Sequence, residues 1–236
     1  MSSRKAAQVP DGHLVNKAQK VYQILLEVFG LPDWRPPLSA IDELVSTILS
    51  QNTNDTNRDV AFNRLKEKYP VWEAVRDAPV EDVIEAIRPA GLANQKAPRM
   101  QAILRQITEE RGCLDLEFLG SLGREEAHAW LSRFNGVGPK TAAIVLQFAL
   151  GIPAFPVDTH VYRVSGRLGL RPEKMNVEET HAWLEKVFAP EHYGPGHMNL
   201  IRLGREICHA RKPDCGRCPL NGICDYYQSL KDPELT

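Results

Sequence analysis

The most informative part of the sequence is Phe134-Asn135-Gly136-Val137-Gly138-Pro139-Lys140-Thr141, which joins two segments with apolar faces at helical spacing. Two glycines two residues apart permit a tight turn and a close approach of the backbone to a ligand. Pro139 suits the first turn of the following helix, where its missing N–H costs nothing. The stretch predicts a helical hairpin. The start of its second helix would grip a phosphate without reading base sequence, although a plain hairpin that only needs a glycine turn fits the same residues.

The segments on either side extend the helical pattern over nearly the whole chain. Apolar residues recur every three or four positions, and no segment shows the sustained alternation of a strand. Breaks rich in proline or glycine occur near Leu31–Leu38 and Gly151–Pro156. We therefore expect an all-α fold of two helical domains, one of residues 36–150 and one of residues 13–35 with 151–236. The expected helices cover residues 14–28, 41–49, 56–69, 80–87, 95–110, 124–134, 141–150, 161–168, 177–188 and 197–208.

Composition excludes several classes of protein. The 236 residues are 43% hydrophobic and 25% charged, as in a globular protein and not a disordered one. No apolar run approaches the roughly 18–20 residues that span a bilayer. Residues 1–12 are polar and lack the apolar core of a signal peptide, so we expect a flexible tail and an intracellular, cytoplasmic protein. The formal net charge of −1 disfavours a protein that coats nucleic acid by bulk electrostatics, but not one that grips it locally.

Lys140 and Asp158 are the candidate catalytic residues. Lys140 falls in the first turn of the expected second hairpin helix, where the helix dipole disfavours an ammonium group. That effect, with partial burial, would lower the pKa of Lys140 and supply the neutral amine that nucleophilic attack requires. A solvated lysine or a phosphate contact fits equally. Asp158 lies between apolar residues at the start of an expected helix, where it could be a simple N-cap, or activate Lys140, or stabilise positive charge on a sugar.

Four of the five cysteines crowd into one segment and predict a metal site. Cys208, Cys215, Cys218 and Cys224 have the spacing C-x6-C-x2-C-x5-C. Four thiolates with uneven gaps favour a [4Fe–4S] cluster; zinc is the main alternative, and a segment without metal is the remaining one. The basic residues near them indicate either a phosphate-binding surface or a solvated one. Cys113 stands apart, and we expect a small buried hydrophobe there.

Together these motifs resemble the endonuclease III family. The matching residues are Gly136-Val137-Gly138-Pro139-Lys140-Thr141-Ala142, Val157-Asp158-Thr159-His160-Val161 and the four cysteines, in that order. The family contains helix-hairpin-helix DNA glycosylases with a C-terminal iron–sulfur cluster. The resemblance implies a six-helix bundle with the hairpin at about residues 124–150, a cluster domain with its loop at 208–224, and damaged double-stranded DNA bound across the cleft between the domains. It favours [4Fe–4S] over zinc, and a monomer suffices for one site per chain.

The resemblance also implies the chemistry. A damaged pyrimidine is flipped out of the duplex. Lys140 attacks the sugar C1′ and displaces the base, Asp158 assists by accepting a proton or stabilising the cationic sugar, and the resulting Schiff base permits β-elimination of the 3′-phosphate. The enzyme would be a bifunctional glycosylase and abasic-site lyase.

Further residues match the family's DNA contacts. The expected backbone grip involves Gly136, Val137, Gly138, Lys140 and Thr141, with His160 nearby. Leu92 matches the leucine that wedges into the base stack, although a buried leucine at a helix end would fit as well. Asn52 falls where the family has the glutamine that fills the vacated space, and Gln51 is one place earlier. Either amide could therefore fill that space.

Two other functions compete with this interpretation. An adenine glycosylase has the same fold and cluster, but it lacks a lysine at position 140 and carries a catalytic glutamate where this chain has Thr47. A non-catalytic helix-hairpin-helix module needs no lysine–aspartate pair.

The charges are unevenly distributed. Acidic residues dominate Glu73–Ile87, whereas Lys and Arg are in excess in Arg88–Arg111, in Thr159–Lys174 and around the cysteines. We expect the basic segments to face DNA. Because the grip relies on few cations, we expect a shallower salt dependence than a strongly basic protein shows.

Overall fold

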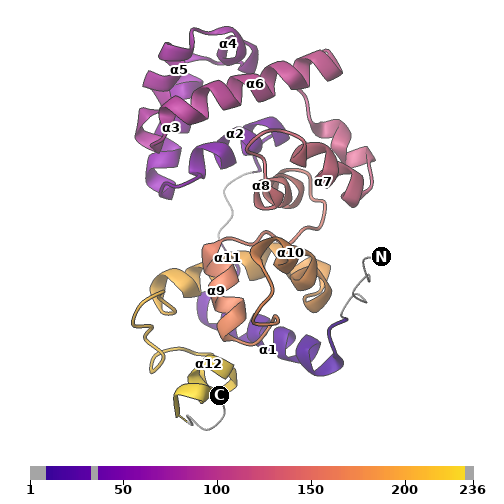
Figure 1. Ribbon diagram of the computed structural model, residues 1–236, viewed down its shortest axis with the longest axis vertical. Helices are drawn as coiled ribbons and strands as arrows, with labels where there is room; N and C mark the ends of the chain where they lie inside the picture. Colours follow the sequence, from indigo (N-terminus) through magenta and orange to yellow (C-terminus); the bar gives the residue numbers. More distant parts are fainter. Residues whose placement is uncertain (1–8, 33–36, 232–236) are drawn as a thin grey trace, which may run out of the picture. The chain divides into compact units, whose positions relative to one another are not determined.

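The computed structural model describes residues 9–32 and 37–231. Within them the chain forms α-helices, short 3₁₀ turns and one π-helical turn, and no strand, so the predicted all-α fold is confirmed (Figure 1). No described helix is long and apolar enough to cross a membrane. The chain divides into two compact units, residues 36–152 and residues 1–35 with 153–236. We name them the hairpin unit and the cysteine unit.

The hairpin unit contains, among its described residues, α2 (Ala40–Ser50), α3 (Asp55–Lys68), α4 (Trp72–Asp77), α5 (Val80–Ile87), η1 (Arg88–Ala90), α6 (Ala93–Arg111), η2 (Glu117–Ser121), α7 (Arg124–Ser132), α8 (Pro139–Ile144) and the π turn η3 (Val145–Ala149). Helix α2 forms its centre and packs against α3, α6, α8 and η3. Leu44, Ile48 and Leu49 of α2 are completely buried. A helix that is apolar on most sides is stable only inside such a core.

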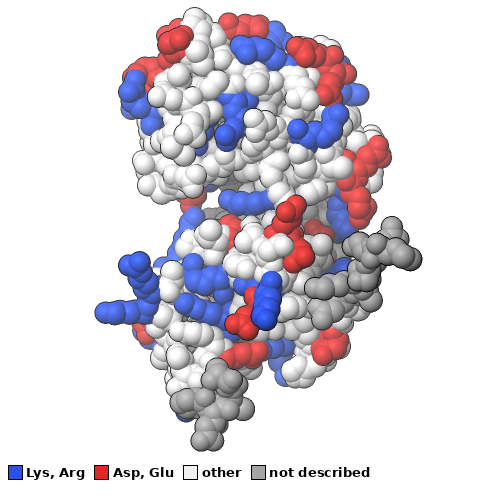
Figure 2. All heavy atoms as spheres, viewed as in Figure 1, with Lys and Arg blue, Asp and Glu red and all other residues white. Residues whose placement is uncertain are grey.

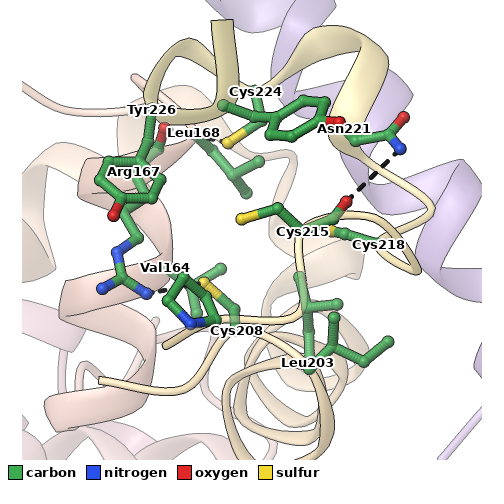
Figure 3. Close-up of a pocket in the computed structure, with 13 residues that line it drawn as sticks. Val164, Arg167, Leu168, Leu203, Cys208, Cys215, Cys218, Asn221, Cys224 and Tyr226 are labelled. Atoms are coloured by element: carbon green, nitrogen blue, oxygen red, sulfur yellow. Dashed lines mark hydrogen bonds between the residues drawn. The ribbon is translucent and has the colours of Figure 1, made fainter. Parts of the chain in front are cut away.

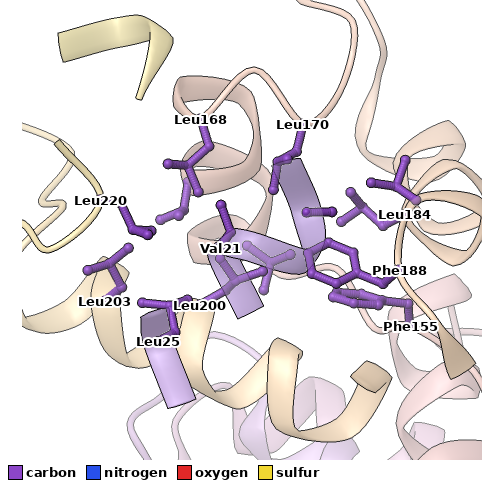
Figure 4. Close-up of a cluster of buried hydrophobic side chains, with 14 of the residues drawn as sticks. Val21, Leu25, Phe155, Leu168, Leu170, Leu184, Phe188, Leu200, Leu203 and Leu220 are labelled. Carbon is purple, nitrogen blue, oxygen red and sulfur yellow. The ribbon is translucent and has the colours of Figure 1, made fainter. Parts of the chain in front are cut away.

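The cysteine unit contains, among its described residues, α1 (Gly12–Phe29), α9 (Thr159–Arg167), α10 (Val177–Val187), η4 (Pro190–His192), α11 (Tyr193–Glu206), η5 (Asn221–Ile223) and α12 (Asp225–Lys231). Helix α1 comes from the opposite end of the chain and packs on α10 and α11. Its Val21 and Leu25 are buried in one core with Phe155, Leu184 and Leu200 (Figure 4). Burial of this apolar surface, at about 25 cal/mol per Å², attaches α1 to the C-terminal helices.

Side-chain caps set several helix starts. Asn176 accepts from the Glu179 N–H while the Glu179 carboxylate accepts from the Asn176 N–H, a complete capping box at α10. At α1 the Asp11 side chain accepts from the Leu14 N–H at 2.7 Å, so this helix begins at Gly12, inside the range expected for the tail. Residues 1–8 of that tail lie outside the described residues. The remaining side-chain caps are Ser39, Asn54 and Asp158.

Three local features differ from expectation. Helices α4 and α12 are too short to show a clear apolar period, so the pattern does not predict them. Tertiary contacts hold α4, because it packs on α6 and the Trp72 indole donates to Asp42 at 2.8 Å. Cys113 is exposed, and the prediction of burial is wrong. It follows Gly112, the left-handed residue that ends α6, where the chain turns along the surface.

Candidate functional site

The glycine hairpin between α7 and α8 has the geometry that its sequence predicts. Gly136 has a φ of +86°, which favours glycine. The Val137 N–H donates to the Phe134 carbonyl at 3.0 Å, and both of these side chains are buried. Gly138 is the N-cap of α8, and its carbonyl accepts the first helical hydrogen bond, from Ala142. The turn is therefore anchored in the core, with α8 starting directly after it.

Gln51 ties the end of α2 to this hairpin. Its side-chain amide donates to the Gly136 carbonyl at 3.0 Å. The Arg99 guanidinium donates to the Gln51 side-chain oxygen at 3.5 Å. Arg99 also covers Gly136 so closely that a Cβ there would lie 2.3 Å from the Arg99 Cδ. The next residue, Asn52, is exposed and has a φ of +53°. Adjacent amides thus have different surroundings, one in the hairpin network and one at the surface.

Leu92 stands at the tip of the loop between η1 and α6. It has a φ of +51° and its side chain is 48% exposed. The alternative of a buried leucine at a helix end is therefore wrong. The Leu92 carbonyl accepts from the N–H groups of Gln95 and Lys96, at 2.9 and 3.0 Å. These two hydrogen bonds tie Leu92, in its left-handed conformation, to the first turn of α6.

Lys140 and Asp158 begin helices in different units. Lys140 is the second residue of α8 in the hairpin unit and is half-buried. Asp158 is the N-cap of α9 in the cysteine unit, where its Oδ1 accepts from the Val161 N–H at 2.7 Å. The N-cap role predicted for Asp158 is present. It fixes the carboxylate at the helix start, where the dipole favours a negative charge.

The backbone before Asp158 is held by buried side chains that sequence reasoning missed. His181 Nδ1 lies 3.1 Å from the Phe155 carbonyl, and His197 Nδ1 lies 2.8 Å from the Pro156 carbonyl. Because a carbonyl only accepts, both imidazoles carry their proton on Nδ1. Glu185 accepts from the Phe155 N–H at 3.1 Å. A lone histidine on an expected helix carries no sequence signal that its partner is a carbonyl in a distant loop.

His160 and Arg163 connect the start of α9 to the end of α11. The Arg163 guanidinium donates to the carbonyls of Gly204 and Cys208, at 2.9 and 3.1 Å, and lies 3.1 Å from His160 Nδ1. Since a guanidinium only donates, His160 Nδ1 is the acceptor. A Cβ on Gly204 would lie 2.9 Å from the His160 Cβ, so this glycine permits the close approach of the two helices.

All four clustered cysteines line a single pocket (Figure 3). The Arg167 guanidinium donates to the Cys208 sulfur at 3.3 Å, and the Cys224 thiol donates to the Arg167 carbonyl at 3.3 Å. The rest of the lining is largely apolar, with Val164, Leu168, Leu203 and Ile207. Burial raises the pKa of the Cys215, Cys218 and Cys224 thiols. An all-sulfur donor set fits a soft metal centre and not calcium or magnesium, and binding would displace these protons.

The arginines of α9 and the turn after it make hydrogen bonds within the cysteine unit. Arg167 donates to the carbonyls of His209 and Ala210, at 2.7 and 3.1 Å. Arg171 donates to the Tyr162 and Met175 carbonyls and stacks on the Tyr162 ring. With Arg163, all three are half-buried. The guanidinium groups of these three arginines already bond to backbone carbonyls of their own unit, and the expectation that this segment faces DNA stays a prediction.

The basic residues around the cysteines are, by contrast, on the surface. In the view of Figure 2, Lys and Arg side chains gather over the part of the cysteine unit that carries α11 and the following loop. Arg202 is paired with Glu206, and Arg217 with Asp214. The exposed members of this group are Arg202, Arg205, Arg211, Lys212 and Arg217. We call them the cluster-side basic residues.

Comparisons with known proteins agree with this geometry. Residues 45–190 match the family described as HhH-GPD superfamily base excision DNA repair protein, and residues 208–224 match the iron–sulfur binding domain of endonuclease III. An Arabidopsis thaliana protein provisionally named a DNA glycosylase is 42% identical over 197 residues, 79% of this chain and 67% of that protein. Endonuclease III of Thermotoga maritima is 36% identical over 186 residues, 78% and 82% of the two chains.

The solved structures show the same relationship. A non-covalent complex of endonuclease III with DNA has a TM-score of 0.78 and 28% identity, covering 92% of this chain and 98% of that one. A trapped covalent intermediate of endonuclease III with DNA has a TM-score of 0.77. The hairpin and the cysteine pocket define a base-excision DNA glycosylase and abasic-site lyase that binds DNA and carries a [4Fe–4S] cluster. Within the HhH-GPD superfamily, the chain belongs to the endonuclease III family.

Proposed function

We propose that this enzyme removes oxidised or otherwise damaged pyrimidines from duplex DNA, with Lys140 as the nucleophile and Asp158 as its assistant. The position of Lys140 carries the proposal: it lies in the first turn of α8, directly after the Gly136–Gly138 turn, and is half-buried. A neutral lysine amine is the form that nucleophilic attack and Schiff-base chemistry require.

The proposed reaction has two stages. The neutral Lys140 amine attacks the sugar C1′, and the bond from C1′ to the base breaks with its electron pair on the base. Asp158 stabilises the cationic sugar and accepts the proton that the attacking nitrogen loses. The C1′–O4′ bond then breaks, O4′ takes up the proton that Asp158 accepted, and a protonated Schiff base forms between C1′ and Lys140. This Schiff base acts as an electron sink, so that a proton leaves C2′ and the C3′–oxygen bond breaks with its electron pair on the phosphate oxygen. Hydrolysis of the Schiff base returns Lys140.

We propose that the backbone at the start of α8 holds the DNA phosphates. This grip uses the glycine turn and the N–H groups of Gly138, Lys140 and Thr141. Val137 contributes through its buried side chain, which fixes the turn, since its N–H already bonds to Phe134. His160 can face DNA only through Nε2, because Nδ1 accepts from Arg163.

Two exposed residues act on the base stack in this proposal. Leu92 wedges into it, supported by its exposure and its left-handed backbone. Asn52 fills the space that the flipped base leaves. Gln51 does not, because its amide is already bonded to the hairpin.

Four cysteines hold the cluster in this proposal, namely Cys208, Cys215, Cys218 and Cys224. When bound, the cluster covalently joins four points of the C-terminal segment. Arg167 orients one ligand through its contact with the Cys208 sulfur. The enzyme acts as a monomer, since each chain carries one complete set of these residues.

The residue at position 47 argues against the alternative function of an adenine glycosylase. That enzyme needs a glutamate there, whereas the Thr47 hydroxyl is buried and donates to Glu43 at 3.3 Å. Glu43 itself lies one turn earlier in α2.

Borohydride trapping on abasic-site duplex DNA tests the proposal. The wild type should form a covalent adduct, Lys140→Ala should form none, and Lys20→Ala, which removes an exposed lysine of α1, should trap like the wild type. Equal trapping by Lys140→Ala would reject the nucleophile. Absence of trapping by the wild type would favour a non-catalytic binding module.

A further inference from the structure

Lys96 is a completely internal lysine that the proposed chemistry does not use. It lies in the first turns of α6 and is 2% exposed. A buried ammonium group is costly unless polar partners surround it. Its Nζ donates to the Leu49 carbonyl at 2.7 Å and to the Ala90 carbonyl at 2.8 Å. Both partners belong to other elements, so the contacts reach well beyond the helix of Lys96.

The Leu49 contact completes the end of α2. The last carbonyls of a helix have no partner within it and need other donors. Here the Thr47 carbonyl accepts from the Ser50 hydroxyl, the Ile48 carbonyl from the Gln51 N–H, and the Ser50 carbonyl from the Thr53 N–H. The Leu49 carbonyl is the fourth, and its donor is the Lys96 ammonium group. A cation at a helix C-terminus also interacts favourably with the dipole.

The hydrogen bond to Ala90 holds the loop that carries Leu92. Ala90 ends η1, two residues before Leu92. The Lys96 side chain bonds to the carbonyl before that leucine, while the Lys96 backbone N–H bonds to the carbonyl of Leu92 itself, at 3.0 Å. One residue therefore holds the Leu92 loop from both sides. Leu92 itself is 48% exposed, so these hydrogen bonds contribute to holding its loop.

We propose that Lys96 is a positioning residue that sets the spacing between the two loops carrying Asn52 and Leu92. The ammonium group joins the end of α2, three residues before Asn52, to the start of the Leu92 loop. The inference rests on the proposed roles of these two residues in entering the DNA helix. It assigns Lys96 no chemical step, since its nitrogen is internal and bonded to two carbonyls. Losing the link would let the loops shift independently, and a misplacement of about 1 Å can cost about 100-fold in rate.

Gln101 provides a matched control on the same helix. It is also 2% exposed, and its amide also donates to two carbonyls, those of Val75 and Ala78, both at 2.8 Å. These partners lie at the end of α4 and not in the loops of Asn52 or Leu92. Lys96→Met and Gln101→Met thus each remove an internal donor from two carbonyls while retaining an apolar stem. Only the first variant disconnects the two loops.

The test uses the full-length holoenzyme and two DNA probes. The first probe is a duplex with a tetrahydrofuran abasic analogue, whose affinity is compared with that of the undamaged duplex. We expect Lys96→Met to lose about 10- to 100-fold of this preference, and Gln101→Met to keep it. The second probe is an abasic site in single-stranded DNA, where no opposite strand needs to be displaced. Borohydride trapping there should be the same for both variants and the wild type.

The outcomes separate this inference from the proposed function. An unchanged preference in Lys96→Met, with trapping intact, would overturn the role of Lys96 while leaving Lys140 in place. Failure of the wild type to trap would reject the proposed function instead. If Lys96→Met does not fold, Lys96→Gln replaces it, because this side chain keeps N–H donors but is one bond shorter. A loss of preference in Lys96→Gln would support the inference, because its shorter side chain cannot reach both carbonyls, and an unchanged preference in Lys96→Ala, at full cluster content, would reject it.

Discussion

The side-chain amide of Gln51 donates to the backbone carbonyl of Gly136 at 3.0 Å. This bond joins the residue after α2 to the left-handed glycine of the hairpin, across 85 positions of sequence. It separates two neighbouring amides by role, since Asn52 is exposed and Gln51 is half-buried. In the sequence the two residues are equivalent candidates for filling the space of a flipped base. Their hydrogen bonding distinguishes them.

Asn52→Ala should change how the enzyme senses the opposite base, and Gln51→Ala should not. Without Asn52, affinity for a duplex with a tetrahydrofuran site should fall about tenfold, the cost of about one hydrogen-bonded polar contact to DNA, and depend less on the base opposite. Gln51→Ala should lower stability by about 1 kcal/mol through the lost bond to Gly136. Binding assays with each of the four opposite bases, together with Tm, measure both. A change of opposite-base dependence in Gln51→Ala alone would reverse the assignment.

Gly136→Ala should destabilise the hairpin for two reasons, one from the backbone conformation and one from a neighbouring side chain. A left-handed φ costs a residue with a Cβ about 1–2 kcal/mol, and the new Cβ would lie 2.3 Å from Arg99. Thermal unfolding should show the loss of stability, and duplex binding should weaken. Gly123→Ala is the control, because Gly123 has a φ of −64° and nothing within 4 Å of its Cβ position. Equal Tm values for the two variants would contradict the strained turn.

The parts of this fold that follow from local pattern could be predicted from the sequence. Pro139 and the two glycines predict the start of α8, and apolar spacing predicts α1, α2 and α5, because those signals lie within a few residues of each other. Buried side chains that form hydrogen bonds with residues far away in the sequence could not be predicted. Lys96 and His181 look like ordinary helix residues, and their partners are backbone carbonyls 47 and 26 positions away in sequence. A carbonyl exists at every residue and so leaves no mark in a sequence.

The same reasoning applies to the arginines that bond to backbone carbonyls and yields a prediction on salt dependence. Arg217 is exposed, whereas Arg167 is bonded to two carbonyls and to Cys208. If Arg217 contacts a phosphate, Arg217→Ala should reduce the slope of log affinity against log salt by about 1. Arg167→Ala should leave the slope unchanged but lower Tm and cluster content, read from visible absorbance. A reduced slope with Arg167→Ala, at full cluster content, would place that arginine on the DNA instead.

The buried Lys96 makes stability depend on pH in a direction that can be stated. Burial lowers the pKa of Lys96 from 10.5 to about 8. Between these two pKa values the unfolded chain binds more protons than the folded one, so the free energy of unfolding rises with pH. The rise is complete above pH 10.5, and below about pH 8 this residue no longer changes the free energy with pH. From pH 7.5 to 9.5 the gain is on the order of 2 kcal/mol. The free energy of unfolding is measured by urea titration at each pH. The value for the wild type minus the value for Lys96→Met should increase over this range. Lys20→Met, a change at an exposed site, should follow the wild type. A wild-type minus Lys96→Met difference that stays flat or falls over this range would mean that the ammonium group is not desolvated, and that solvent reaches the link between the two loops.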